Sequence, residues 1–330
     1  MARRVLAPGL VLVVLVATGC SRPEADDVPA GPVRDLGAQQ VFRHQVYAQR
    51  DTGALRLDLF VPPRRGVATP LVVYVHGGGW DAGVRTLDAD ASAPEAPAAQ
   101  RLWERGYAVA TVDYRLSGVA RSPAQVVDVA DAVRWLQARS ARWGLDPDRA
   151  LWGASAGGHL VSQLGMVAGD PAEPGGGLTG IRAVVDWFGP SDLSAEAQHE
   201  HPRLQDYVRR AVAGLLGCLP VDCPDVADAA SSAGACGWWS PSAHRRPGLR
   251  RPGRYPVRNV SGDEPPFLIQ QGTADSLVPL DQSLDFAETL RSSGVTAEVH
   301  PYQGLDHGFG VGPQTALVVD TLDIFVRTHV

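Results

Sequence analysis

Three residue types that together support nucleophilic catalysis lie far apart in this 330-residue chain. Ser155 lies at the centre of Gly153–Gly157, a G-x-S-x-G pattern whose small residues permit a tight turn that exposes the hydroxyl. Asp275 ends a Gly-Thr-Ala-Asp string, and His307 lies in Asp-His-Gly-Phe. A serine activated by a histidine, which an aspartate orients, performs acyl transfer through a covalent intermediate. We therefore predict Ser155 as nucleophile, His307 as base and Asp275 as the orienting acid.

Each of these assignments has a competitor. Ser155 in a glycine-rich loop could merely cap a helix. Asp281, Asp263 and Glu264 are other acids in the same part of the chain, and we interpret them as a helix-start charge and solvated loop residues. His300 falls within or at the end of an expected strand, so we interpret it as structural.

A run of glycines provides a second motif. His76-Gly-Gly-Gly-Trp80 follows the apolar run 71–75 and resembles the loop that shapes the oxyanion hole in esterases and lipases. Glycines allow backbone N–H groups to face a site, so Gly77 and Gly78, with the amide of Ala156, are predicted to bind an oxyanion. A phosphate loop is the competing interpretation, but it requires a Lys and a following Ser or Thr that this motif lacks.

Strands and helices are expected to alternate along the chain. Alternating apolar residues at 55–61 predict an edge hairpin strand, and 126–136 has the apolar spacing of a helix, with Asp128 and Asp131 off the apolar stripe. A turn is expected at Asp146-Pro147. Buried strands are expected at 71–75 and 107–112, and further strands at 150–152, 181–188, 267–270 and 296–300. Further helices are expected at 157–167, around Leu284, Ala287 and Leu290, and at 313–330. This pattern predicts an α/β protein whose mostly parallel sheet has helices on both faces and binding groups at the carboxyl ends of its strands.

One segment breaks the alternation. Residues 191–265 contain no convincing buried strand, and we interpret them as a cap-like insertion over the site. Within them, 231–258 interleaves Arg with Pro and Gly, a composition that buries little apolar area. A basic membrane-contacting loop, a poorly ordered insertion and a frameshifted stretch of gene remain open interpretations.

Together the motifs resemble the α/β-hydrolase esterase and lipase family, in its bacterial acetyl-esterase and hormone-sensitive-lipase-like branch, over 41–330. The matching strings are His76 to Trp80, Asp113-Tyr-Arg-Leu116, Asp146-Pro-Asp-Arg149, Gly153 to Gly158, Gly272 to Asp275 with Val278-Pro279, and Asp306-His-Gly-Phe309. The resemblance implies an α/β-hydrolase fold, a serine carboxylesterase acting on short acyl esters, no cofactor and no metal. It implies catalytic roles for Ser155, Asp275 and His307 and a structural polar tie for Asp113 and Arg115. Gln271 departs from a family His, a change expected to be harmless.

The N-terminus has the organisation of an export signal. Arg3 and Arg4 precede an apolar run that ends in Thr-Gly-Cys20, so 1–19 is predicted to be a lipoprotein-type signal peptide and Cys20 the lipidated residue. Ordinary signal cleavage and an uncleaved anchor are the alternatives. Residues 20–40 are expected to form a flexible tether, and 41–330 the hydrolase domain. The expected location is the cell envelope, with membrane attachment through the lipid.

Export permits disulfides among the remaining cysteines. Cys218 and Cys223 are close enough to staple a local loop, which would leave Cys236 unpaired, and pairings with Cys236 stay open. A zinc site is disfavoured because no second Cys pair and no His at ligand spacing lie nearby.

Composition limits the partners. The chain has 36 acidic and 30 basic residues, a formal charge of −6, which argues against nucleic-acid binding. The expected substrate is a small-molecule or polysaccharide ester. A serine peptidase or amide hydrolase of the prolyl-oligopeptidase kind and a non-catalytic envelope lipoprotein are the alternatives, and the sequence leaves the oligomeric state undetermined.

Overall fold

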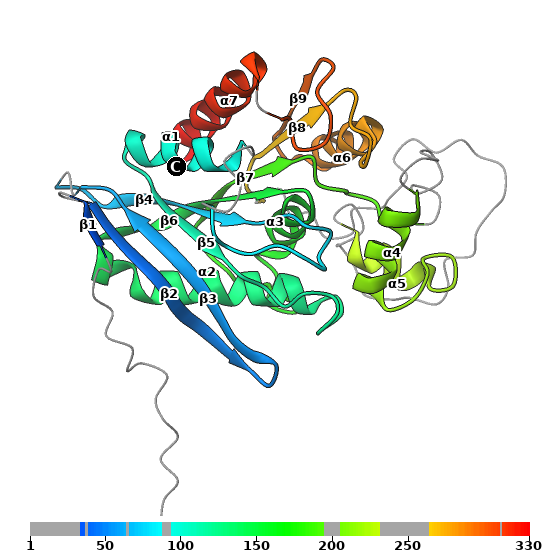
Figure 1. Cartoon of the computed structure of the whole chain (residues 1–330), viewed down its shortest axis with the longest axis horizontal. Coiled ribbons are helices and arrows are strands. Elements are labelled where there is room, and N and C mark those ends of the chain that lie inside the picture. Colours follow the sequence, from blue (N-terminus) through cyan, green and yellow to red (C-terminus); the bar gives the residue numbers. More distant parts are fainter. Residues whose placement is uncertain are drawn as a thin grey trace, which may run out of the picture.

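The computed structural model describes residues 34–36, 39–63, 66–87, 94–194, 205–231, 264–310 and 312–330. Within these residues, nine strands form one sheet in the order β1-β2-β3-β5-β4-β6-β7-β8-β9 (Figure 1). The strands are β1 Arg34–Leu36, β2 Gln39–Arg50, β3 Gly53–Val61, β4 Thr69–Val75, β5 Ala108–Val112, β6 Leu145–Ala154, β7 Ile181–Trp187, β8 Phe267–Gly272 and β9 Ala297–Tyr302. The helices are α1 Glu95–Arg105, α2 Ala124–Trp143, α3 Ala156–Val167, α4 Gln205–Leu216, α5 Pro224–Ala230, α6 Leu280–Ser292 and α7 Pro313–His329.

Helices cover both faces of the sheet, which confirms the predicted α/β architecture. From β5 through β9 all neighbouring strands pair in parallel, whereas β1, β2 and β3 form an antiparallel arm. Helices α1 and α7 lie together on one face, and α2, α3 and α6 contribute to the core on the other face (Figure 1). The parallel strands place their carboxyl ends along one edge, where binding groups collect in such folds.

The antiparallel arm differs from the expectation for this region. The strand expected at the edge, β3, is interior, because β2 pairs with its free side and β1 with β2. Strand β1 and the start of β2 also fall inside the stretch 20–40 that was predicted to be a tether. The missed β2 alternates only weakly between apolar and polar residues, so its period-2 pattern is faint.

The turn expected at Asp146-Pro147 lies inside strand β6. The pairing of β4 with β6 shifts between Thr69↔Leu145 and Leu71↔Arg149, so β6 carries two extra residues there. Asp146 accepts a hydrogen bond from the amide of Asp148 at 2.9 Å, the local pattern of an Asx turn. The turn chemistry predicted from sequence therefore produces a bulge rather than the end of the strand.

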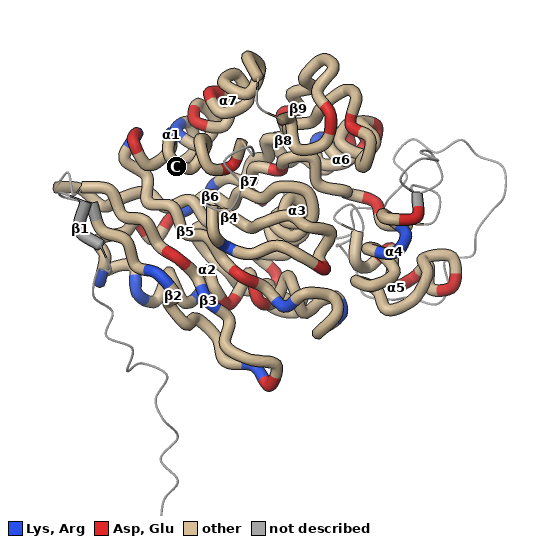
Figure 2. The backbone as a smooth tube through the Cα atoms, in the orientation of Figure 1, with Lys and Arg blue, Asp and Glu red and all other residues tan. Residues whose placement is uncertain are grey.

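Buried ion pairs attach the antiparallel arm to α2. Asp128 is fully buried, contrary to its expected place off the apolar stripe, and its carboxylate pairs with Arg50 at 2.8 Å and Arg115 at 2.7 Å. Basic and acidic residues accordingly lie side by side over β2, β3 and α2 (Figure 2). Asp113 pairs instead with Arg85 at 2.6 Å. Asp113 and Arg115 are therefore structural in separate networks and do not form one common tie.

The stretch 191–265 contains two helices, α4 and α5, and no strand in its described residues. A disulfide joins Cys218 to Cys223 at the corner between these helices. Cys20, Cys236, Asp263 and residues 232–258 lie outside the described residues. Across the described part of the chain, no helix combines the length and the apolar character needed to span a bilayer.

Two further features differ from expectation: the side of α6 that is buried, and the presence of helix α1. Leu284 is 42% exposed, and the apolar residues that α6 buries are Phe286, Ala287 and Leu290. Helix α1 was not anticipated, because the start of its sequence is rich in Ala and Pro and carries only a short apolar stripe.

Candidate active site

Ser155 occupies a strained turn between β6 and α3. Its backbone has φ of 53° and ψ of −119°, a conformation that L-residues rarely adopt. The Ser155 amide donates to the carbonyl of Trp187 on β7 at 2.8 Å, which anchors the turn at the sheet edge. This geometry lifts the hydroxyl above the carboxyl ends of the strands, as the G-x-S-x-G context predicts.

The glycines around Ser155 make close backbone contacts. A Cβ on Gly153 would overlap the carbonyl of Gly157, and a Cβ on Gly157 would overlap the carbonyl oxygen of Val75 on β4. Helix α3 is buried along its whole length, so it cannot shift outward to make room. Packing of main-chain atoms thus fixes the position of the nucleophile.

His307 connects Ser155 to Asp275. Its Nε2 lies 2.9 Å from Ser155 Oγ, and its Nδ1 lies 2.9 Å from Asp275 Oδ2 and 3.1 Å from Oδ1. The three residues therefore form a continuous relay, and Asp281 and Glu264, two of the other acids considered from sequence, take no part in it. His300 lies on β9, partly exposed, with Nε2 3.3 Å from Glu298.

Asp275 is held by a dense set of donors. Its side chain is fully buried, and Oδ1 accepts the backbone amides of Leu277 at 2.9 Å and Val278 at 2.8 Å. Gln271 Nε2 donates to Oδ2 at 2.6 Å. Hydrogen bonds from several donors stabilise an ionised carboxylate in a buried site. The arrangement keeps the carboxylate facing His307 Nδ1.

A second carboxylate joins the two loops that carry the acid and the base. Asp306 Oδ1 accepts the Ser276 amide and the Ser276 hydroxyl, both at 2.7 Å, and the His307 amide at 2.7 Å. These hydrogen bonds, with that from the Ser276 hydroxyl the largest, lower the pKa of Asp306 below its ordinary value. We name this arrangement the Asp306 clamp.

The glycine loop after β4 lies against the nucleophile. A Cβ on Gly77 would sit 3.2 Å from the Cβ of Ser155, so only glycine allows the loop this close. Gly78 has φ of 105°, and His76 Nδ1 lies 2.8 Å from the carbonyl of Gly77. Burial lowers the pKa of His76, which stacks on Tyr114. Gly77, Gly78 and Ala156, the first residue of α3, line the same cavity as Ser155.

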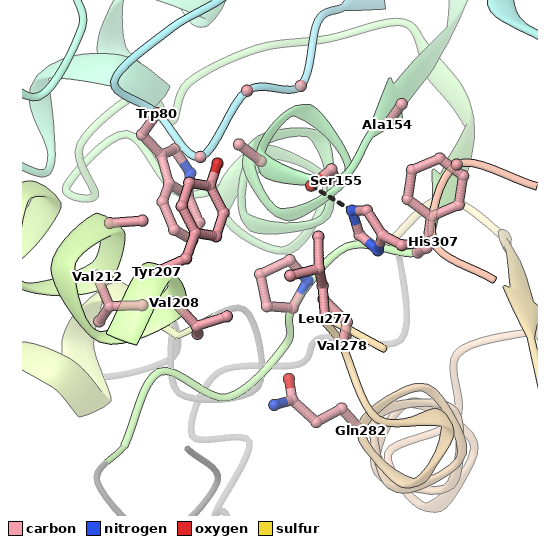
Figure 3. Close-up of a pocket in the computed structure, with 18 of the residues that line it drawn as sticks. Trp80, Ala154, Ser155, Tyr207, Val208, Val212, Leu277, Val278, Gln282 and His307 are labelled. Atoms are coloured by element: carbon pink, nitrogen blue, oxygen red, sulfur yellow. Dashed lines mark hydrogen bonds between the residues drawn. The ribbon is translucent and has the colours of Figure 1, made fainter. Parts of the chain in front are cut away.

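A cavity of about 310 Å³ opens beside this relay. Ser155 and His307 form one side, and Trp80 with residues of α4 forms the other (Figure 3). Its apolar lining comprises Trp80, Phe188, Leu193, Val208, Ala211, Val212, Leu277, Val278 and Pro279. Tyr207 from α4 also lines the cavity. Its hydroxyl lies close to the glycine loop, so that a Cβ on Gly79 would meet this hydroxyl at 2.5 Å.

Hydrogen bonds attach the insertion to the helix that follows Ser155. His159 on α3 accepts from Trp80 Nε1 at 3.3 Å through Nδ1, so its Nε2 donates to the Ala230 carbonyl of α5 at 2.6 Å. Burial lowers the pKa of His159 to about 4, and the ring is neutral near neutral pH. Gln163 also donates to Ala230, at 3.0 Å.

The supporting residues were not identified from sequence. Gln271 contacts Asp275 four residues away, whereas the contacts of the Asp306 clamp, His159 and Tyr207 join segments distant in the chain. No local motif marks any of these roles. The Asp306-His307 string was the one available indication, since it placed an acid beside the base. Among the described residues, no group of three or more His, Cys, Asp or Glu side chains forms a potential metal site.

A family model described as BD-FAE matches residues 57–234, more than half of the chain. The chain belongs to the BD-FAE family. A second model, the prolyl oligopeptidase family, matches residues 241–330 of this BD-FAE chain. The first match covers Ser155 and the glycine loop, and the second covers Asp275 and His307.

The curated relatives of this BD-FAE protein include esterases of bacteria. It is 28% identical over 303 residues to esterase LipC of Mycobacterium tuberculosis, covering 87% of this chain and 66% of the relative. It is 30% identical over 270 residues to the probable carboxylic ester hydrolase LipM of the same organism, covering 79% and 55%. The chain thus spans between about half and two-thirds of the length of these relatives.

Solved structures confirm the α/β-hydrolase fold. A truncated carbohydrate esterase from gut microbiota aligns over 90% of this chain and 99% of its own, with a TM-score of 0.67 at 24% identity. A hyperthermophilic esterase from the archaeon Pyrobaculum calidifontis aligns over 89% and 86%, with a TM-score of 0.66 at 22% identity.

Proposed function

We propose that this protein is a serine carboxylesterase that hydrolyses short acyl esters through an acyl-enzyme. The single observation that carries the proposal is the relay in which His307 Nε2 lies 2.9 Å from Ser155 Oγ and Nδ1 lies 2.9 Å from Asp275. The naming of its curated relatives as esterases supports the same activity. Nothing in the relay requires an added cofactor.

In the proposed reaction, Ser155 attacks the ester carbonyl while His307 takes its proton. Asp275 holds the imidazole in the tautomer that presents a free Nε2 and stabilises its charged form. The amides of Gly77, Gly78 and Ala156 would receive the oxyanion, and each such donor contributes about 2.7 to 4 kcal/mol. His307 then protonates the leaving alcohol, and water repeats the sequence to release the acid.

The cavity favours a small, neutral acyl group. Its 310 Å³ is at the lower end of the range of about 300 to 1,000 Å³ typical of ligand pockets. Val208, Val212 and Leu277 give it apolar walls, and Glu95 and Asp192 are the carboxylates among its described lining residues. An anionic acyl chain would meet these two carboxylates and, among the described lining residues, no Arg.

An acyl chain-length series on purified protein tests this proposal. We expect p-nitrophenyl acetate, propionate and butyrate to be hydrolysed with kcat/KM falling steeply beyond short chains. Ser155→Ala should lower kcat by at least about 10⁴-fold. If Ser155→Ala hydrolyses these esters as fast as the unaltered protein, the proposed reaction is wrong, and the result favours the alternative of a non-catalytic envelope lipoprotein.

Amide hydrolysis is the second candidate, favoured by the prolyl oligopeptidase match over 241–330. That family match covers the acid and the base but not the glycine loop at Gly77 and Gly78. Comparing p-nitrophenyl esters with aminoacyl p-nitroanilides of the same acyl group separates the two activities. We expect the ester to be the better substrate by kcat/KM, and a preference for the anilide would reverse the assignment.

We propose further that the protein is exported and held in the cell envelope by a lipid on Cys20. The support is the order of basic, apolar and small residues that precedes this cysteine. Cys20→Ala should move the protein from the detergent-extracted to the aqueous fraction, while Cys236→Ala should leave it in the detergent-extracted one. Equal partitioning of both variants would exclude the anchor.

A further inference from the structure

Two consecutive glutamines occupy the carboxyl end of β8, and both are fully buried. They point to opposite faces of the sheet, because side chains alternate along a strand. Gln270 receives a hydrogen bond from Trp187 Nε1 at 2.7 Å and donates to Tyr302 and to the Val318 carbonyl. None of its partners belongs to the relay.

Gln271 faces the relay. Its Nε2 donates to Asp275 Oδ2 at 2.6 Å and to the Val278 carbonyl at 3.0 Å, and its Oε1 accepts the Ser283 hydroxyl at 3.0 Å. Ser283 is itself buried on α6. All three polar positions of the amide are therefore occupied, each by a partner of matching donor or acceptor character.

These contacts fix which end of the amide meets the carboxylate. The Val278 carbonyl and the Asp275 carboxylate can only accept, so rotating the amide by half a turn would set Oε1 against two other acceptors. In the orientation that remains, the Ser283 hydroxyl donates to Oε1. Gln271 must then present a donor to Asp275 Oδ2, the oxygen that lies 2.9 Å from His307 Nδ1. A neutral donor stabilises the ionised carboxylate without competing with His307 for its charge.

We propose that Gln271, whose Oε1 is held by Ser283, is a positioning residue that keeps Asp275 aimed at His307. The inference rests on the proposed esterase function and deepens it. It predicts that Gln271 affects turnover only through the Asp275 carboxylate. Groups that orient a ligand or catalytic side chain from behind typically change activity by about 10- to 100-fold when removed.

The first experiment compares Gln271→Met with Gln270→Met in the full chain. Both substitutions keep the length of a buried side chain and remove three hydrogen bonds. We expect Gln271→Met to lower kcat for p-nitrophenyl acetate by about 10- to 100-fold with KM changed less than about 3-fold. Gln270→Met should change kcat by less than about 3-fold, although its thermal midpoint falls by a comparable amount.

A double-mutant cycle separates positioning from general destabilisation. Asp275→Ala should lower kcat by about 10⁴-fold, and residual hydrolysis is then measured under single-turnover conditions with enzyme in excess. In that background Gln271→Met should have no further effect on the rate, because the group through which it acts is absent. An additive loss of 10-fold or more in the Asp275→Ala background would overturn the proposal.

Ser283→Ala provides a second variant in case Gln271→Met does not fold. It removes only the hydroxyl that holds Oε1 of the amide, so we expect a fall in kcat of about 2- to 10-fold that also disappears in the Asp275→Ala background. A rate for Ser283→Ala and Gln271→Met equal to that of the unaltered protein would refute the positioning role. It would leave the esterase function standing provided that Ser155→Ala is inactive, whereas hydrolysis that survives Ser155→Ala would refute the esterase function itself.

Discussion

The two ends of the Ser155–His307–Asp275 relay are built by different physical means. At the nucleophile end, main-chain atoms of β4, β6 and α3 pack so closely that glycines are required at Gly153 and Gly157. At the acid–base end, side chains hold side chains: Gln271 holds Asp275, and the Asp306 clamp holds the His307 loop. The nucleophile end depends on close main-chain packing that leaves no room for side chains, and the acid–base end depends on directed hydrogen bonds.

This difference implies different responses to substitution. A tightly packed turn has no alternative arrangement, because protein interiors are nearly incompressible, so an added methyl group forces backbone movement. Several donors hold each carboxylate at the acid–base end, so the loss of one hydrogen bond weakens the position of the carboxylate without abolishing it. A single substitution at the nucleophile end should therefore abolish activity, whereas the loss of one supporting hydrogen bond at the acid–base end should only reduce it.

Gly157→Ala tests the nucleophile end and should have the largest effect. The added Cβ would overlap the carbonyl oxygen of Val75, and neither β4 nor α3 can move away. We expect the free energy of unfolding to fall by about 3 kcal/mol or more, with no detectable esterase activity. Urea denaturation and p-nitrophenyl acetate hydrolysis measure both effects.

The matched control is Gly169→Ala, just beyond the end of α3, where a Cβ would meet nothing within 4 Å. This variant should retain both stability and activity. If Gly157→Ala behaves like Gly169→Ala, packing does not fix the nucleophile as we argue.

Asp275→Asn tests the acid–base end and should rank second. The amides of Leu277 and Val278 would hold the Asn oxygen, which leaves the Asn NH₂ facing His307 Nδ1. His307 would then carry its proton on Nε2, the wrong tautomer for accepting the Ser155 proton. We expect kcat to fall by about 10⁴-fold. The thermal midpoint should fall too, because the Asn NH₂ would also face Gln271 Nε2, which places one buried donor against another. A fall of less than about 10-fold would mean that another group orients His307.

The same division explains how much could be predicted from sequence. Ser155 and the glycine loop are local motifs, in which the residues that make the turn are neighbours in the chain. His307 and Asp275 follow predicted strands, and parallel strands bring their carboxyl ends to one edge, so their convergence could be expected from the fold alone. The structure brings all three within hydrogen-bonding distance.

The supporting contacts could not be predicted in this way. Gln271 and Ser283 meet because α6 packs beside β8, and nothing in their spacing along the chain specifies that contact. Gln271 was judged a harmless departure because a buried amide has no motif of its own. Asp128 lies off the apolar stripe of its helix, and its burial could not be foreseen because Arg50 and Arg115, the partners that neutralise it, lie on other elements.

The third prediction concerns the Asp306 clamp, where we expect an intermediate loss. Asp306→Ala removes the acceptor shared by Ser276 and the His307 amide, so the base loop loses one of its attachments to the acid loop. Misplacement by about 1 Å can cost about 100-fold in rate, and with the other attachments intact we expect about 10-fold in kcat. Asp306→Asn keeps the acceptor oxygen and should lose much less, whereas equal losses in both variants would assign the effect to charge.

The smallest effect on activity should come from Asp186, a buried carboxylate at the nucleophile end. Asp186 accepts the Ser162 hydroxyl at 2.8 Å and the Gly189 amide at 2.8 Å, and it contacts no relay residue. Burial raises its pKa to about 6 from 3.8. The folded protein therefore binds a proton between about pH 4 and pH 6 that the unfolded chain has released, so the free energy of unfolding should fall as the pH rises through that window.

Asp186→Asn should remove this pH dependence without affecting catalysis. An Asn can keep both hydrogen bonds, accepting from Gly189 and donating to Ser162, and it never ionises. At pH 4 the variant and the unaltered protein should unfold with similar free energies, whereas at pH 8 the variant should be more stable by up to about 3 kcal/mol. Urea denaturation at the two pH values measures the difference, with the exposed Asp222→Asn as the control expected to change it by less than about 0.5 kcal/mol. The kcat of Asp186→Asn should stay within about 2-fold of that of the unaltered protein. A large loss would show that the nucleophile end also depends on a charged side chain.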